Sequence, residues 1–329
     1  MVVIGRNEGD RLVRCLESLR GEARRIVYVD SNSSDASVAK ARASGASVVE
    51  LDPEIPFTAA RARNAGFERL IAERPDTEFV QFVDGDCEVR SGWLEYAAEC
   101  LDERPEVAVA CGRRRERFPE RSPYNRIADI EWDTPVGDAA SCGGDALMRV
   151  RAFREAGGFE PTLIAGEEPE LCLRLRRAGY RIARIPCEMT LHDAAMLRFS
   201  QFWRRAVRTG HAYAEAAYRH GREPERFGVR PLVSSAVWAA GPPLAALLLL
   251  PFSGGAAFCA LGAWSVLLAR VYRDTRRRGY TPRASATYAA ACVVGKLAEL
   301  QGVLQFAWNR GVRRRATRLI EYKGADTSA

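Results

Sequence analysis

Residues 78–86 read Glu-Phe-Val-Gln-Phe-Val-Asp-Gly-Asp, an apolar run that ends in two carboxylates separated by one glycine. A short apolar run of this kind predicts a buried strand, with Asp84 and Asp86 at its carboxyl end. Mg²⁺ and Mn²⁺ take oxygen ligands and are often held by one or two carboxylates together with phosphate oxygens. We therefore interpret Asp84 and Asp86 as a metal site shared with a diphosphate, against the alternative of a solvated acidic turn.

Strand-like and helix-like patterns alternate on both sides of this stretch, over the first two hundred residues. Strand-like runs cover residues 2–4, 25–30 and 46–51, and helix-like stretches cover residues 11–19, 34–43 and 57–73. This alternation indicates right-handed βαβ units, hence an α/β fold with a mostly parallel sheet. Ligands of such sheets bind outside the carboxyl ends of the strands. Polar residues 5–8 and 30–32 are expected at that edge, beside Asp84 and Asp86.

Four further residues, in three segments of the chain, are of types that suit the same chemistry. Glu167 and Glu168 open a helical stretch, where the macrodipole favours acids in any case, and one of them is a candidate general base. His192 follows a strand-like run, and its imidazole is either a third metal ligand or a structural histidine. Arg63, on the helix-like stretch 57–73, is a candidate phosphate contact or part of a solvated helix face.

The composition limits the partners and the compartment. The formal net charge of +7 arises almost entirely from arginine, which suits nucleic acid, anionic lipid or phosphorylated substrates. The arginines gather late in the chain beside apolar runs, which favours lipid and argues against nucleic acid. Nine irregularly spaced cysteines without a Cys-x-x-Cys pair are typical of free thiols. The start resembles no secretory signal, and the short first strand suggests that the natural start lies upstream.

The composition changes after residue 230. No charged residue occurs in 231–269, and because a membrane span needs about 20 apolar residues, this stretch fits two transmembrane helices joined by a tight turn. A buried soluble hairpin is the alternative. Arginines flank the stretch on both sides, so the positive-inside rule places both ends in the cytoplasm.

The segment 284–308 is also apolar, but it contains Lys296 and Glu299. A third crossing would place the basic cluster that follows it on the outside; this cluster comprises Arg310, Arg313, Arg314, Arg315 and Arg318. An interfacial or re-entrant segment is therefore favoured over a third transmembrane helix.

We expect four parts along the chain. Residues 1–195 form the catalytic α/β domain, 196–230 amphipathic interfacial helices, 231–270 the transmembrane hairpin, and 271–329 a basic loop, the third apolar segment and a basic tail. The interfacial assignment rests on aromatic residues among arginines, and packing of these aromatics against the catalytic domain is its alternative.

Together these residues resemble the family 2 glycosyltransferases, inverting enzymes of the GT-A fold, over roughly residues 1–215. The resemblance rests on motifs in the family's order at 2–8, 29–35, 62–66, 83–86 and 157–175. It implies a nucleotide-sugar donor, an acceptor hydroxyl and Mg²⁺ or Mn²⁺ as cofactor.

The resemblance also implies roles for individual residues. Donor contacts would come from Arg6, Asn7, Glu8, Asp30, Arg63 and Asp84, and metal ligands from Asp86, Asp84 and His192. Glu168 stands at the position of the family's catalytic aspartate, and because Glu replaces the usual Asp, Glu167 remains a rival. The acceptor or product side would involve Gly144, Gln201, Trp203 and Arg204.

We expect a membrane-associated inverting glycosyltransferase that acts in lipid-linked glycan, cell-envelope or exopolysaccharide synthesis, with a membrane lipid or lipid-linked glycan as acceptor. It would be a multi-pass protein of the cytoplasmic membrane, with the catalytic domain facing the cytoplasm and no nucleic-acid partner. A processive polysaccharide synthase is one alternative; residues 201–204 resemble a motif of such enzymes, but Arg205 stands where Trp is expected. A non-catalytic nucleotide-sugar-binding membrane protein is the other. The base, the sugar, the acceptor and the oligomeric state are left open.

Overall fold

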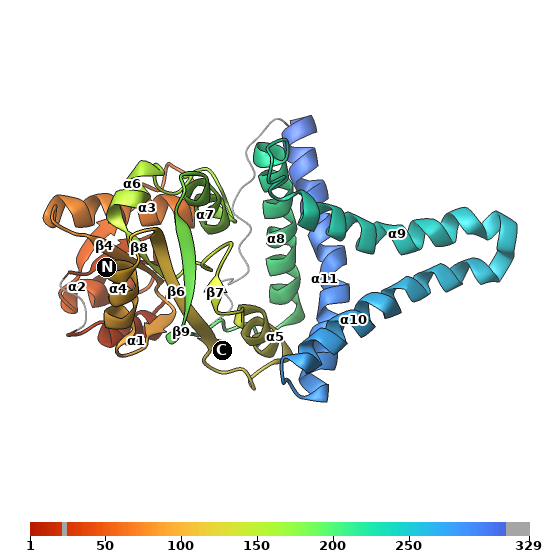
Figure 1. Ribbon diagram of the computed structural model, residues 1–329, viewed down its shortest axis with the longest axis horizontal. Coiled ribbons are helices and arrows are strands. Elements are labelled where there is room, and N and C mark those ends of the chain that lie inside the picture. Colours follow the sequence, from red (N-terminus) through yellow and green to blue (C-terminus); the bar gives the residue numbers. More distant parts are fainter. Residues whose placement is uncertain (22–24, 314–329) are drawn as a thin grey trace. The chain divides into compact units, whose positions relative to one another are not determined.

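The computed structural model describes residues 1–21 and 25–313 and divides into two compact units (Figure 1). The first unit comprises residues 1–118 and 131–194. The second comprises residues 119–130 and the described chain from residue 195 onward. The expected basic tail, with Arg314, Arg315 and Arg318, lies outside the described residues.

One half of the sheet in the first unit is parallel, as the alternation of strands and helices predicts. The strand order is β3-β2-β1-β4-β8-β6-β9-β5, with β7 paired to β9. The parallel strands are β1 (Val2–Gly5), β2 (Val27–Asp30), β3 (Ser47–Glu50) and β4 (Phe79–Asp84). The register pairs Gly5 with Asp30 and Ile4 with Asp84, so the carboxyl ends of three strands lie at one edge.

The other half of the sheet is mixed, so the expected mostly parallel sheet describes only the first four strands. It contains β5 (Cys87–Val89), β6 (Val107–Glu116), β7 (Gly137–Asp138), β8 (Ala146–Arg149) and β9 (Arg181–His192). Strand β8 runs antiparallel to β4 and β6, β9 runs parallel to β6, and β5 and β7 run antiparallel to β9. Only Gly85 and Asp86 separate β4 from β5 in the chain, yet the two strands do not pair, and β5 lies at the far end of the sheet beside β9.

Helices cover the sheet of the first unit. They are α1 (Asp10–Ser18), α2 (Ser37–Ala43), α3 (Ala59–Glu73), α4 (Trp93–Glu103), α6 (Val150–Glu155) and α7 (Glu167–Arg177), and the division between the units falls within α5 (Pro123–Trp132). Helix α3 begins at Thr58, whose hydroxyl accepts a hydrogen bond from the Arg61 N–H at 3.0 Å. It lies so close to the sheet that a Cβ at Gly66 would come within 2.8 Å of Val29.

The second unit is helical and is built on a tight crossing of α8 (Phe199–His220) with α11 (Pro282–Trp308). A Cβ at Gly210 would lie 1.9 Å from the Glu299 carbonyl oxygen, and a Cβ at Gly302 would lie 2.0 Å from that of Val207. The segment 284–308 is thus part of one continuous helix. Its two charged groups, on Lys296 and Glu299, pair with each other at 2.7 Å.

Two segments of the second unit are long and apolar enough to cross a membrane, Val229–Ser253 and Gly255–Arg277. They comprise α9 (Val229–Ser253), the 3₁₀-helix η1 (Gly254–Gly262) and α10 (Ala263–Arg277); α11 ends in the π-helical turn η2 (Asn309–Arg313). Only 22% and 11% of their apolar windows are buried, which disfavours the alternative of a buried soluble hairpin. Length and composition alone give this result, so the transmembrane hairpin stays a prediction.

Helix α9 continues through Pro242 in its interior. Proline has no N–H, so Pro242 cannot donate to the carbonyl of Trp238 one helical turn earlier. The indole N–H of Trp264 on α10 donates to that carbonyl at 2.7 Å. A side chain of the neighbouring helix therefore supplies the hydrogen bond that the proline removes.

Candidate active site

The loops after β1 and β2 are joined around Asp30. Its buried carboxylate accepts hydrogen bonds from the Tyr28 hydroxyl at 2.9 Å, and from the hydroxyl and N–H of Ser33 at 2.6 and 2.7 Å. Asn7, at a positive φ of 55°, accepts a hydrogen bond from the Ser34 N–H at 2.7 Å, and its own N–H donates to Ser33 Oγ at 2.9 Å. The two predicted donor-binding loops therefore form one connected surface.

The other two predicted contacts of the first loop lie beside this surface. Glu8 forms an ion pair with Arg11 at 2.9 Å. The guanidinium of Arg6 lies 5.7 Å from the centre of the Phe57 ring. Phe57 precedes α3, so Arg6 lies near the start of the helix that carries Arg63.

Arg63 links two of the predicted acidic positions. Its guanidinium is buried and bonds to Asp84 Oδ1 and to Glu167 Oε1, at 2.7 Å in each case. Burial works to lower the pKa of Arg63, but the charges of Asp84 and Glu167 outweigh it and raise the pKa above its ordinary value. Phosphate oxygens could replace either carboxylate on this guanidinium, because all of these groups accept its N–H bonds in the same fork geometry.

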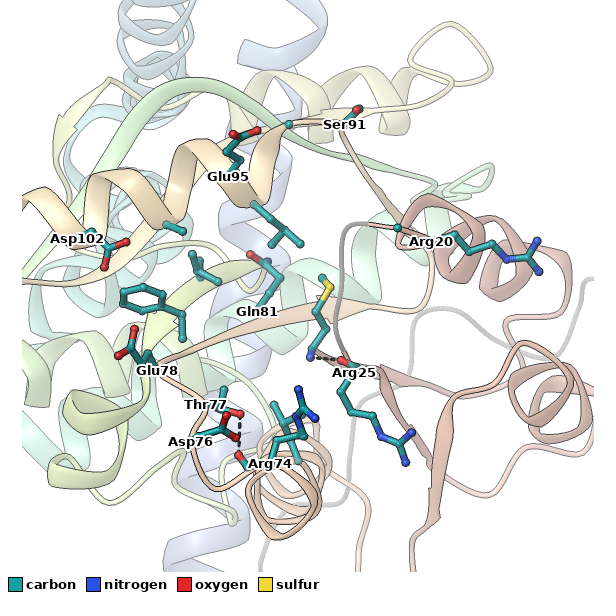
Figure 2. A pocket seen from close by; sticks show the side chains of 18 residues that line it. Arg20, Arg25, Arg74, Asp76, Thr77, Glu78, Gln81, Ser91, Glu95 and Asp102 are labelled. Atoms are coloured by element: carbon teal, nitrogen blue, oxygen red, sulfur yellow. Dashed lines mark hydrogen bonds between the residues drawn. The ribbon is translucent and has the colours of Figure 1, made fainter.

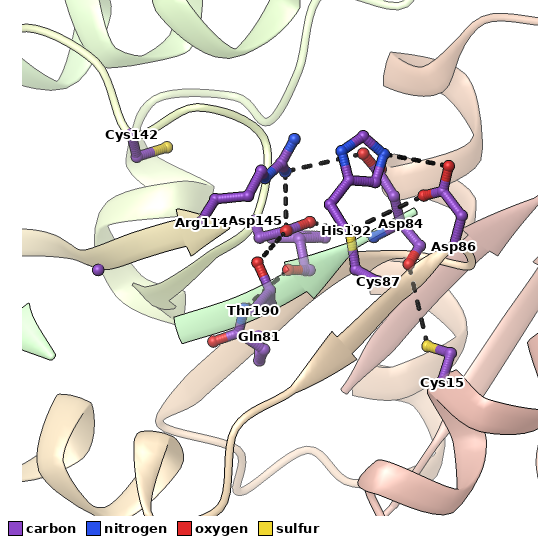
Figure 3. Close-up of polar contacts among 12 residues, drawn as sticks. Cys15, Gln81, Asp84, Asp86, Cys87, Arg114, Cys142, Asp145, Thr190 and His192 are labelled. Carbon is purple, nitrogen blue, oxygen red and sulfur yellow. Dashed lines mark hydrogen bonds and ion pairs between the residues drawn. The ribbon is translucent and has the colours of Figure 1, made fainter. Parts of the chain in front are cut away.

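Asp145 and Arg114 belong to the same cluster and were not predicted from the sequence. Asp145 is completely buried and accepts hydrogen bonds from Arg114 at 2.8 Å, the Thr190 hydroxyl at 2.9 Å and the Asp84 N–H at 3.1 Å (Figure 3). Arg114 lies 3.8 Å from Asp84 Oδ2. A Cβ at Gly144 would come within 3.0 Å of Arg114 Nη2, so this predicted acceptor-side glycine leaves space beside the cluster.

Asp86 and His192 meet across the pairing of β5 with β9. Asp86 Oδ2 lies 3.1 Å from His192 Nε2, and both side chains are buried (Figure 3). Burial lowers the pKa of His192 to about 4, with a contribution from the positive charge of Arg114, so the imidazole is neutral at neutral pH. A neutral imidazole can bind a metal ion.

The donor set fits a divalent cation. Ligand atoms of Asp86, Cys87 and His192 lie within 4.8 Å of one another, and so do those of Asp84, Cys87 and Asp145. The Nδ1 atom of His192 is buried and has no hydrogen-bond partner in the described part of the chain. Cys87 belongs to both groups, but burial raises the pKa of its thiol, which leaves carboxylate oxygens and one imidazole as the ligands. Such ligands suit Mg²⁺ or Mn²⁺, in agreement with the predicted cofactor.

Glu167 and Glu168 occupy the first turn of α7 but have different partners. Glu167 is held by Arg63, as described above. Glu168 Oε1 accepts hydrogen bonds from the Cys142 N–H and from the Cys172 thiol, the latter at 3.2 Å. Its Oε2 atom receives none from the residues that the structure describes. The carboxylate of Glu168 is therefore the better placed of the two to accept a proton.

The remaining predicted residues lie on α8 in the second unit. Gln201 accepts hydrogen bonds from the N–H groups of Leu197 and Arg198 at 2.8 and 3.0 Å and thereby caps the helix. Trp203 donates from its indole to Gln301 on α11 at 2.7 Å, and Arg204 is exposed. Their acceptor-side role stays a prediction.

A cavity of about 1000 Å³ lies at the opposite edge of the first unit's sheet (Figure 2). Met1, Arg25 and Glu78 line it, close to the amino-terminal ends of β1, β2 and β4. None of the predicted site residues lines this cavity. Since α/β sheets bind ligands at the carboxyl ends of their strands, it is not the candidate site.

Solved structures identify the class of fold. A mannosyltransferase from Pyrobaculum calidifontis, in complex with GDP-Man and Mn²⁺, superposes with a TM-score of 0.61 over 94% of this chain and 87% of that chain. The two sequences are 18% identical, so the likeness concerns the fold alone. It is the GT-A fold of glycosyltransferases, as the resemblance implied.

Sequence comparisons find similarity to glycosyltransferases. The model of glycosyl transferase family 2 matches residues 1–157, which is just under half of this chain. A pre-mycofactocin glycosyltransferase of Mycobacterium tuberculosis is 28% identical over 236 residues, which cover 67% of this chain and 47% of the relative. The succinoglycan biosynthesis protein ExoA of Rhizobium meliloti is 27% identical over 193 residues, which cover 54% of this chain and 57% of the relative. The chain thus spans about half the length of these curated relatives.

Proposed function

We propose that this protein is a membrane-associated, metal-dependent glycosyltransferase that moves a sugar from a nucleotide-sugar donor to a hydroxyl group with inversion at the anomeric carbon. The observation that carries the proposal is the meeting of Asp30, Arg63, Asp84 and Asp86 at the carboxyl edge of the sheet, with His192 beside Asp86. The match to glycosyl transferase family 2 over this part of the chain supports it.

The donor would lie along this edge. The nucleoside would contact the joined loops that hold Asp30, and the diphosphate would reach Arg63, displacing Asp84 or Glu167 from its guanidinium. Asp86 and His192, with Asp84, would hold Mg²⁺ or Mn²⁺, which neutralises charge on the diphosphate when bound. The mannosyltransferase of similar fold was solved with GDP-Man and Mn²⁺, which is consistent with this donor chemistry.

Glu168 is proposed as the general base. Its Oε1 is held by Cys142 and Cys172, and its Oε2 would take the proton of the acceptor hydroxyl. The hydroxyl oxygen would then bond to the anomeric carbon while the nucleoside diphosphate leaves from the opposite side, which inverts the configuration. Holding the two reactants in line would supply a large part of the barrier reduction.

A membrane-bound acceptor is proposed from the second unit. Leu247, Leu248 and Phe252 near the end of α9 are 64%, 69% and 88% exposed, which lipid around α9 and α10 would cover. Arginines flank these helices on both sides, which favours a multi-pass arrangement with the first unit in the cytoplasm. The acceptor would then be a lipid or lipid-linked glycan, as in envelope or exopolysaccharide synthesis.

A donor panel tests the proposal. Detergent-purified full-length protein is incubated with UDP-, GDP- and dTDP-sugars, with Mn²⁺, Mg²⁺ or EDTA, and release of nucleoside diphosphate is measured. We expect hydrolysis or transfer with one donor class that requires metal and falls at least about 100-fold in Asp86→Asn. Asp76→Asn, at the opposite edge of the sheet, is the matched control. An undiminished rate in Asp86→Asn would refute the metal site, and retention of the anomeric configuration in the product would refute inversion.

A further inference from the structure

Two thiols lie against the carboxylate of Glu168. Cys172 follows Glu168 by one turn of α7, and Cys142 lies in the loop before β8. The two sulfur atoms are 3.9 Å apart, and Cys172 Sγ is 3.2 Å from Glu168 Oε1. All three side chains are buried, and their ligand atoms lie within 4.8 Å of one another.

The two sulfur separations lie close to the edges of a zinc coordination tetrahedron. With Zn–S bonds of about 2.3 Å and Zn–O bonds of about 2.0–2.2 Å, two sulfur ligands lie about 3.8 Å apart, and a sulfur and an oxygen about 3.6 Å apart. The observed 3.9 Å and 3.2 Å differ from these values by only a few tenths of an ångström. One small cation could therefore contact all three groups after minor side-chain movement.

We propose that Cys142, Glu168 and Cys172 form a binding site for a thiophilic divalent cation such as Zn²⁺, and that a cation held there blocks the base. The inference rests on the proposed function only in assigning the base to Glu168. It concerns a site separate from Asp86 and His192, where oxygen ligands suit harder cations.

Burial raises the pKa of Cys142, and the hydrogen bond to Cys142 together with burial raises that of Cys172, so both thiols are protonated in the metal-free protein. Binding would form two Zn–thiolate bonds and release two protons to solvent, so affinity rises with pH.

The surroundings of the cluster would support the bound ion. Two thiolates and one carboxylate around Zn²⁺ give the site a net charge of −1. The positive guanidinium of Arg184 lies nearby, where it bonds to the Cys142 carbonyl at 3.4 Å, and would offset this charge. The Cys142 N–H already orients Glu168 Oε1, as outer hydrogen bonds do for metal-bound carboxylates. With Oε1 on the ion, the carboxylate would lose the basicity that proton abstraction needs.

Cobalt spectroscopy tests the site without any need for activity. Co²⁺ is titrated into the full-length protein in detergent with excess Mg²⁺, and the near-ultraviolet charge-transfer absorption of cobalt-bound thiolate is recorded. We expect saturation near one equivalent, loss of the band in Cys142→Ser and Cys172→Ser, and an intact band in Cys87→Ser. Cys111→Ser replaces a buried thiol outside the cluster and is the matched control.

Inhibition and X-ray absorption complete the test. Under saturating Mn²⁺, Zn²⁺ should inhibit transfer, and the concentration for half-inhibition should rise at least tenfold in Cys172→Ser relative to the wild-type protein. X-ray absorption on zinc-loaded wild-type protein should show two sulfur ligands, a measurement that requires no variant to fold. Absence of the cobalt band, its loss only in Cys87→Ser, or fewer than two sulfur ligands would overturn the proposal. If no donor is turned over, the proposed function fails while the cobalt and absorption results still decide the metal site.

Discussion

Asp145→Asn is expected to lower the unfolding temperature of the protein by roughly 6–20 °C. The Asp145 carboxylate is completely buried and accepts hydrogen bonds from Arg114, Thr190 and the Asp84 N–H at 2.8, 2.9 and 3.1 Å. Asparagine keeps the shape but removes the charge, so the buried Arg114 loses its nearest counter-ion, and the amide cannot accept at both of its polar atoms. Loss of one partner of a buried ion pair costs about 3–5 kcal/mol, and each kcal/mol lowers the unfolding temperature by about 2–4 °C for a unit of this size.

Thermal unfolding in detergent with EDTA, followed by intrinsic fluorescence, measures this effect. The double variant Arg114→Met with Asp145→Asn removes both charges and should recover part of the loss, because no unpaired charge stays buried. Asp138→Asn is the control, since this acid forms an exposed pair with Arg181 and should change the temperature by no more than about 1–2 °C. An Asp145→Asn protein that unfolds within that same margin, or a double variant whose loss is simply the sum of the two single losses, would refute the reasoning.

Three further predictions concern the site and the helix crossing. Glu168→Gln should lower kcat about 100-fold or more with little change in donor KM, because it removes the proposed base. Glu167→Gln should mainly raise donor KM, because Glu167 holds the proposed phosphate-binding Arg63. Steady-state kinetics that show the reverse pattern would make Glu167 the base. Burial lowers the pKa of His192 to about 4 from an ordinary value of 6.5, so the unfolded chain takes up the proton first as the pH falls. The unfolding temperature of EDTA-treated protein should therefore fall between pH 6.5 and 4, and a fall of equal size in His192→Gln would contradict this assignment. Gly210→Ala should destabilise the crossing of α8 with α11 by about 1–3 kcal/mol, seen as faster proteolysis of the second unit, while Gly241→Ala, where a methyl group has space, should behave like the wild type.

Residue patterns predicted the parallel half of the fold because each strand there is a short apolar run that ends in polar residues. Asp30 and Asp84 could be placed at one edge for the same reason, since parallel strands share the direction of their carboxyl ends. The mixed half of the sheet, from β5 to β9, was harder to predict. Its antiparallel pairs join strands that are far apart along the chain, such as β4 with β8 and β5 with β9, and such long-range pairing leaves no periodic signal in the sequence.

Arg114 shows why part of the site could not be found. It lies in the run Arg113–Arg117, where five consecutive charged residues are typical of a solvated strand edge. In the structure, β6 changes register against β9 between Cys111 and Arg113 and again between Arg113 and Arg114. Such irregularities decide which side chain faces the interior, and Arg114 therefore turns toward Asp145. The register of β6 against β9 is therefore known only from the structure, where the two strands are paired.

The apolar segments of the second unit could be recognised from their length and lack of charge, but the contacts among its helices could not be predicted. Composition identified the stretch from 231 to 269, and it could not reveal that Lys296 pairs with Glu299 or that two glycines let α8 and α11 touch. Those contacts depend on which faces of the helices meet, which an almost uniformly apolar sequence does not encode as periodicity.

The hydrogen bond from Trp264 to the Trp238 carbonyl has a consequence for how the protein would be assembled. In hydrocarbon, a carbonyl without a donor costs several kcal/mol, because no water can replace the missing N–H. Helix α9, with Pro242 in its interior, would carry this cost alone until α10 arrives with its indole. If α9 and α10 span a bilayer as proposed, the two helices would therefore enter it as a pair rather than one after the other. A chain truncated before Trp264 would then leave α9 poorly inserted and open to degradation.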